Sequence, residues 1–219
     1  MTDERPYPWL LVVVDGPSEA RDARPGADGG GAIRRIVRAV FGTEAAENLH
    51  VVHWGAFNRT RLADERKRTR SYAVRAVQAA RFGTKTTAYG TIILLDNDHS
   101  DHDHLAEIRD ALAAVEDLPE RSAVGIAREM IEAWLLADPA LCSPDQLPKR
   151  PPDALWGAKQ DPSSNHPKRV LERIVLKPRG WRHRDATDAW DPARARPHSP
   201  SLDAFMREVE ALAQRQGVF

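Results

Sequence analysis

Two nearly uninterrupted apolar runs constrain this sequence more than any other feature. Residues 8 to 16 read PWLLVVVDG and residues 90 to 96 read GTIILLD, and neither shows the alternation of a half-exposed strand. Continuous apolar runs of this length are typical of strands buried on both faces, as in a parallel sheet covered by helices on both sides. We therefore expect both runs to be strands inside an α/β domain.

The segments between and after these runs alternate between strand and helix patterns. Further short strands are expected at 48–54 and 121–127, and helices at 32–41, 62–82, 105–115 and 128–138. The predicted helix at 62–82 is long and basic. This order of elements predicts a Rossmann-like parallel sheet flanked by helices, and we assign this α/β core to residues 1–142.

Residues 143–219 differ from the core in composition. Between 143 and 200 the chain holds 10 of its 16 prolines and three of its six tryptophans. We expect an irregular segment that wraps on the core and buries its tryptophans, with one helical stretch at HPKRVLERIV. Ser199 as N-cap and Pro200 at the first helical position predict a final helix over 199–215. We expect this extension and the core to form one globular unit.

The formal net charge is zero, but the charges are segregated along the chain. Residues 59–85 hold nine Lys or Arg against two acids, 96–120 hold nine acids against one Arg, and 168–196 hold nine Lys or Arg against four acids. An acidic middle between basic blocks suits an anionic polymer held beside a metal site. The same charges also suit ordinary exposed helix faces, so both interpretations stay open.

The cysteine content and the N-terminus indicate the compartment. Cys142 is the only cysteine, so a disulfide framework is excluded. The polar start MTDERPYPW is not typical of a signal peptide, and no apolar run approaches the length of a membrane helix. We expect a soluble cytoplasmic protein.

Acidic side chains follow both central strands. Asp15 and Glu19 follow the first strand, and Asp96 and Asp98 follow the strand at 90–96. If these strands are neighbours, the four carboxylates converge where the carboxyl ends of parallel strands open into a ligand crevice. Crowded carboxylates repel one another unless a cation lies among them, and oxygen ligands favour Mg²⁺ or Mn²⁺. The sequence therefore predicts a metal site for phosphoryl chemistry.

Glu129 and Glu132 lie one turn apart on the helix predicted at 128–138. They are either part of a solvent-exposed face or further ligands beside the metal site. Leu136 projects between them and would be left exposed on a solvent face, so the sequence leaves both interpretations open.

Other polar residues near the DND motif receive simpler interpretations. Asp101 and Asp103 are expected to cap the following helix, because acids favour helix N-termini. His99, His102 and His104 are loosely spaced and lack a cysteine partner, so we expect loop and helix-start positions rather than a zinc site.

Basic side chains are expected to contact nucleic acid through its phosphates. The candidates are Arg66, Lys67, Arg68 and Arg70 in the predicted basic helix, together with Lys159 and Lys168.

Several of these motifs resemble a known family. VVVDGPSEA and IILLDND are similar to the acidic motifs of the Toprim fold, which occurs in topoisomerases, primases and the overcoming-lysogenization-defect nucleases. AREMIEAWLLADP (127–139), NHPKRVLERIV (165–175) and SPSLDAF (199–205) follow in the order seen in the Toprim-like bacterial family called domain of unknown function 4276. The resemblance spans about Leu10 to about Leu212.

The resemblance implies a Toprim-like fold and an Mg²⁺-dependent nuclease in bacterial anti-phage defence, often beside a partner ATPase. One departure is that Asp15 stands where the family usually has glutamate. This favours an alternative, in which a Toprim-like module binds nucleic acid or the ATPase without cutting. A second alternative is a haloacid-dehalogenase-like phosphatase with Asp96 as nucleophile and Asp98 as acid/base, but that motif normally opens its fold and two strand–helix units precede it here.

Overall fold

The computed structural model of the chain describes residues 10–14, 31–55, 71–86, 89–97, 104–128, 131–148, 152–155 and 161–218. Four strands form one sheet in the order β2-β1-β3-β4, and every neighbouring pair is parallel. The strands are β1 (Leu10–Val14), β2 (Leu49–His53), β3 (Gly90–Asn97) and β4 (Ser122–Arg128).

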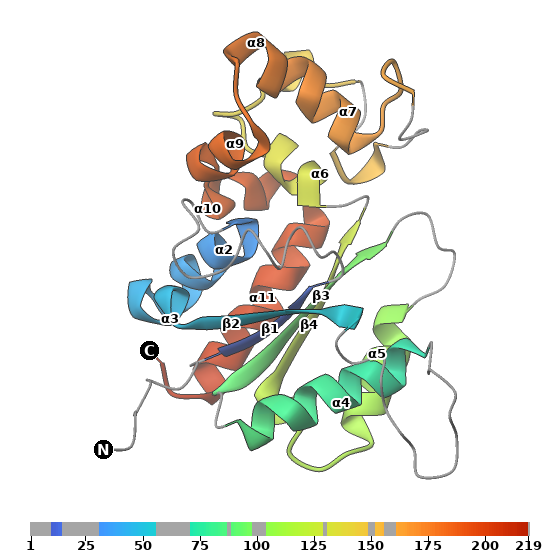
Figure 1. Ribbon diagram of the computed structural model, residues 1–219, viewed down its shortest axis with the longest axis vertical. Helices are drawn as coiled ribbons and strands as arrows, with labels where there is room; N and C mark the ends of the chain where they lie inside the picture. The colour runs from blue at the N-terminus through green and yellow to red at the C-terminus, as the bar shows by residue number, and fades with distance from the viewer. Residues whose placement is uncertain are drawn as a thin grey trace.

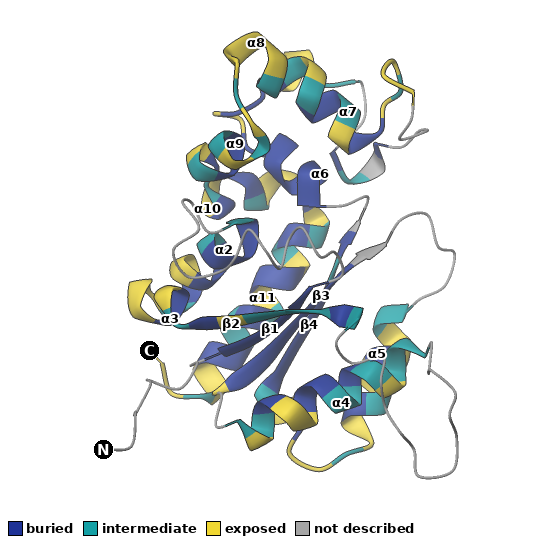
Figure 2. Cartoon of the chain, in the orientation of Figure 1, coloured by how far each residue is buried: buried dark blue, intermediate teal, exposed yellow. Residues whose placement is uncertain are grey.

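β1 and the described side chains of β3 are buried on both faces, as the apolar runs predict, whereas most of the edge strand β2 is only partly buried (Figure 2). Alternate residues of a strand point to opposite faces, so Val12 and Ile92 join one apolar cluster while Val13 and Ile93 join the other. One face is covered by α2 (Gly31–Phe41), α3 (Thr43–Glu47) and α11 (Pro200–Arg215), and the other by α4 (Tyr72–Lys85) and α5 (His104–Ala113) (Figure 1). The prediction of an α/β fold with a parallel sheet is confirmed.

The helix predicted over 62–82 needs a correction. The backbone of Ser71 is extended, and its hydroxyl accepts a hydrogen bond from the N–H of Val74, so α4 begins at Tyr72 and does not include Ser71. A serine in this position satisfies a free N–H of the first turn and marks a helix start. Residues 56–70 lie outside the described residues.

The segment predicted to be irregular is more helical than expected. The helical stretch expected at HPKRVLERIV is present as α7 (Pro167–Leu171) with the π-helical turn η5 (Glu172–Leu176). The segment also contains α8 (Lys177–Arg179), α9 (His183–Ala189) and α10 (Pro192–Ala195), which were not expected. Short 3-10 turns of the same segment lie at Pro144–Gln146, Pro152–Ala154 and Arg196–His198, and another precedes β4 at Pro119–Arg121. Many of the prolines begin these elements, because proline has no N–H to lose at the first helical position.

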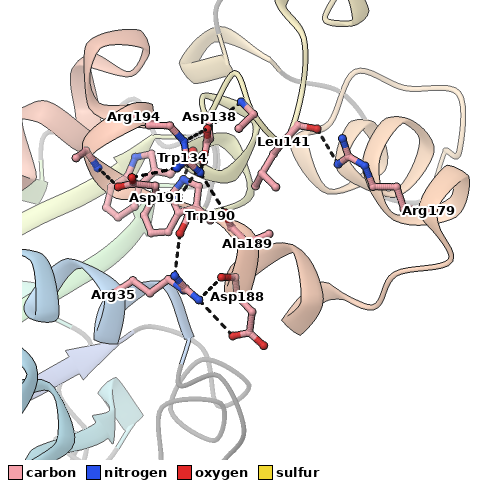
Figure 3. Close-up of polar contacts among 12 residues, drawn as sticks. Arg35, Trp134, Asp138, Leu141, Arg179, Asp188, Ala189, Trp190, Asp191 and Arg194 are labelled. Carbon is pink, nitrogen blue, oxygen red and sulfur yellow. Dashed lines mark hydrogen bonds and ion pairs between the residues drawn. The ribbon is translucent and has the colours of Figure 1, made fainter.

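α7, α9 and α10 pack beside α6 (Ile131–Leu136) or α2 at one end of the molecule, whereas α11 lies on the sheet (Figure 1). Trp190 is fully buried, as predicted for a tryptophan of this segment, and its indole N–H donates to the carbonyl of Trp134 at 3.0 Å. Arg35 of α2 donates to the carbonyls of Trp190 and Asp188 (Figure 3). These bonds attach the C-terminal helices to α6 and to α2.

The predicted final helix is present as α11. The hydroxyl of Ser199 accepts from the N–H of Leu202 at 3.2 Å, and Pro200 occupies the first helical position, as predicted. Phe205 packs on the ring of Trp134 with centroids 5.4 Å apart, so α11 also contacts the helix that follows β4.

Candidate functional site

The order of the sheet places its topological switch point between β1 and β3. β2 lies on one side of β1 and β4 lies beyond β3, so the strand order reverses between the two central strands. In open parallel sheets, ligands bind outside the carboxyl ends of the strands at this point. β1 and β3 are hydrogen-bonded neighbours, and Val14 pairs with Leu94. The two strands that precede the acidic motifs are therefore neighbours, which is the condition under which the four carboxylates were predicted to converge.

The acidic motifs themselves are only partly described. The backbone of Asp96 pairs with Ala127 of β4 near the carboxyl end of β3, and its side chain lies outside what the structure describes. Asp15, Glu19, Asp98 and Glu129 lie outside the described residues. Asp15 follows Val14 directly in the chain, and Glu129 follows the last residue of β4. Their roles as metal ligands stay predictions.

Glu132 is the one predicted ligand whose side chain is described, and it is buried. Its exposed fraction is 7%, and Leu136 is also buried, so a solvent-exposed face is excluded for Glu132. Its carboxylate Oε1 lies 3.9 Å from Nζ of Lys168 and 3.6 Å from Nε2 of His183. Glu132 therefore links the first turn of α6 to the beginnings of α7 and α9.

These neighbours determine the charge state of Glu132. Burial raises the pKa of its carboxyl, but the contact with His183 and the charge of Lys168 lower it further, so the pKa lies below its usual range. The ammonium of Lys168 and the imidazole of His183 are the side chains that contact this buried carboxylate. This arrangement supports an ion-pair role for Glu132 in joining three helices, and its role as a metal ligand stays a prediction.

Of the residues predicted to contact nucleic acid, Lys168 is the one that the structure describes. Lys168 lies in the first turn of α7 and its side chain is half exposed. Arg66, Lys67, Arg68, Arg70 and Lys159 lie outside the described residues.

His104 occupies the helix-start position that was predicted for it. It is the first residue of α5, its ring packs against Tyr72 with centroids 4.3 Å apart, and its Nδ1 lies 3.6 Å from Glu107. His99, His102, Asp101 and Asp103 lie outside the described residues.

Within the described ranges, no three His, Cys, Asp or Glu side chains are grouped as a metal site would require. Most of the predicted ligands lie outside those ranges.

Among the helices of the described part, none is long and apolar enough to cross a membrane. Cys142 is buried, and burial raises the pKa of its thiol to about 11, which disfavours the nucleophilic thiolate.

One contact of this site was not predictable from local sequence patterns. His183 lies 51 positions after Glu132, and no motif spacing connects the two. The only signal in the sequence is the basic block at 168–196, which indicates charge but does not identify a partner.

Comparison of the chain with models of protein families, with curated proteins and with solved structures finds no match.

Proposed function

We propose that this chain is a Toprim-type phosphodiesterase that cleaves nucleic acid with Mg²⁺ or Mn²⁺. The observation that carries the proposal is the parallel pairing of β1 with β3 at the switch point of the sheet. In the sequence, an acidic motif follows each of these two strands. The carboxyl ends of neighbouring parallel strands share one edge, where ligand sites of α/β folds occur.

Asp96 and Asp98 would hold the metal ion, and Asp15 and Glu19 would complete the site or orient the attacking water. A bound Mg²⁺ polarises the phosphate and stabilises the leaving oxygen. Lys168 would bind a phosphate of the substrate beside this edge. The resemblance to domain of unknown function 4276 extends the proposal to anti-phage defence in the bacterial cytoplasm with a partner ATPase.

A second candidate function is a Toprim-like module that binds nucleic acid without cleaving it. The contacts of buried Glu132 with Lys168 and His183 favour it, because this carboxylate already has side-chain partners within the protein. Aspartate at position 15 in place of the family's glutamate favours it as well. The phosphatase alternative gains no comparable support.

Cleavage of a sequence-independent probe separates the candidates. Purified protein would be incubated with bis-p-nitrophenyl phosphate and with labelled single- and double-stranded DNA and RNA, in Mn²⁺ and in chelator. We expect metal-dependent hydrolysis that Asp96→Asn lowers by more than about 100-fold, since supporting partners of a metal site cost only about 10- to 100-fold.

Asp110→Asn is the matched control, because Asp110 is an exposed acid on α5 and the change removes the same charge. Hydrolysis that persists in chelator or in Asp96→Asn would contradict the proposal. Binding of nucleic acid without any hydrolysis would support the module instead.

A further inference from the structure

A pocket of about 450 Å³ opens among the short C-terminal helices that contain the two partners of Glu132, Lys168 and His183. It lies between the first turn of α7, the π-helical turn η5, the end of α8 and the beginning of α9. Its lining residues are Lys168, Arg169, Leu171, Glu172, Leu176, Lys177, Gly180, Trp181 and His183. This volume lies within the range of small-ligand sites.

The shape of the pocket follows from how one helix ends. Pro178 lacks an N–H and its ring would clash with a carbonyl of the preceding turn, so widening of that turn to π geometry accommodates it. Gly180 then adopts a left-handed φ of 64°. The N–H of Trp181 donates to the carbonyl of Leu176 at 2.9 Å, and that of Gly180 to Lys177 at 3.2 Å. This pair of bonds fixes Trp181 beside Leu176 at the pocket wall.

The charge of the pocket is positive. Lys168, Arg169 and Lys177 are permanent cations among the lining residues, and Glu172 is the one carboxylate that the described residues contribute to the lining. Glu172 is held by Arg169 at 2.9 Å and by Lys177 at 3.3 Å, so its charge is compensated within the wall. The carboxylate of Glu132 lies 3.9 Å from Lys168, but Glu132 is buried and is not among the lining residues.

Trp181 offers an aromatic surface in the same pocket. Its side chain is half-buried, and the guanidinium of Arg179 lies 4.8 Å from the ring centroid. Trp181 is among the residues that line the pocket, and Arg179 is not. A cationic wall and an aromatic surface match the two parts of a nucleotide, its phosphate and its base.

We propose that this pocket binds one nucleotide unit of single-stranded nucleic acid, with its phosphate at Lys177, Arg169 and Lys168 and its base on Trp181. The ligand class rests on the proposed function, and the inference adds where and in which form the nucleic acid is held. Residues 168–184 contain seven Lys or Arg and one acid. Basic charge that continues past the pocket suits a polymer backbone better than a free nucleotide.

Binding of a fluorescent oligonucleotide in chelator tests the pocket without involving a metal. Lys177→Ala is compared with Arg207→Ala, because both side chains are 71% exposed and both pair with one acid. We expect Lys177→Ala to bind single strands about fivefold more weakly at 0.1 M salt and to lower the salt slope by about 0.7, the value for one phosphate contact. Arg207→Ala is expected to bind as the wild type does.

The aromatic surface is tested by Trp181→Ala against Trp181→Phe, with circular dichroism of each variant as a check of folding. Loss of stacking is expected to weaken binding by about five- to 150-fold in Trp181→Ala, and Phe is expected to restore most of it. Unchanged binding by Lys177→Ala and Trp181→Ala would overturn the proposal. Equal affinity for a mononucleotide and for the oligonucleotide would overturn the assignment of a polymer.

The two proposals fail separately in this design. Asp96→Asn is expected to lose metal-dependent hydrolysis while it keeps binding of the oligonucleotide in chelator. Lys177→Ala is expected to lose affinity for the oligonucleotide in chelator, where no metal ion takes part, so failure of the metal site leaves this result unchanged.

Discussion

Asp138 is a fully buried carboxylate that is satisfied by four hydrogen bonds. Arg194 donates from Nε and Nη2 to its two oxygens at 3.0 and 2.9 Å, and the backbone N–H groups of Asp191 and Ala140 donate at 2.9 and 3.0 Å (Figure 3). Such a two-point contact with arginine is strong and geometrically specific. Asp138 therefore fixes α10 against the end of α6.

Replacement of Asp138 by asparagine tests this role. Burial raises the pKa of Asp138, but the hydrogen bonds from Arg194, Asp191 and Ala140 lower it further, so the pKa lies below its usual range. We expect Asp138→Asn to lower the free energy of unfolding at pH 7 by on the order of 3 kcal/mol. Urea unfolding of both proteins measures the difference.

The sign of the pH dependence follows from the lowered pKa. The contribution of Asp138 is fully present above the unfolded-state pKa of about 3.9 and is lost as the pH falls toward the lower folded-state value. The difference between wild type and Asp138→Asn should therefore shrink below about pH 4. A difference that stays constant down to pH 3, or an equal effect of Asp110→Asn, would contradict the account.

At the scale of elements, α11 packs closely on β4 at Gly125. A Cβ atom at this position would overlap the ring of Phe205, so the glycine permits the close approach of helix and strand. Both residues are buried. Overpacking of a core of this kind forces side chains or backbone to shift.

We expect Gly125→Ala to lower the free energy of unfolding by about 1–3 kcal/mol, with the secondary structure retained. Thermal unfolding followed by circular dichroism measures the loss. The double variant Gly125→Ala with Phe205→Leu should recover part of it, because leucine vacates the space of the ring. If the double variant loses the sum of the two single effects, the steric explanation is wrong.

The elements that could be predicted from the sequence are those with strong local signals. The apolar runs before Asp15 and Asp96 gave buried strands, and Ser199 with Pro200 gave the start of α11. The helical stretch at HPKRVLERIV was predicted and is present as α7 with the π-helical turn η5. The short helices α8, α9 and α10 could not be predicted in this way, because each contributes only a few apolar residues to the core. Their positions depend on long-range contacts such as those of Trp190 with Trp134 and Arg35.

At the scale of the whole molecule, the sheet order brings β1 and β3 together although α2, α3, β2 and α4 separate them in the chain. Adjacent acidic motifs were predicted only on the condition that these strands are neighbours, and the sheet meets that condition. The pocket around Trp181 could not be predicted, because its residues come from three helices and the turn between them. A basic block in a sequence shows charge but neither a cavity nor an aromatic wall.

Calorimetric titration with Mg²⁺ and Mn²⁺ tests the proposed metal site at the carboxyl ends of β1 and β3 most directly, because it requires neither substrate nor partner. We predict that the wild type and Asp110→Ala bind the ion with the same affinity and that Asp96→Ala loses measurable binding. Absence of binding by the wild type, even with an oligonucleotide present, would contradict the proposal. Undiminished binding by Asp96→Ala would place the ion elsewhere.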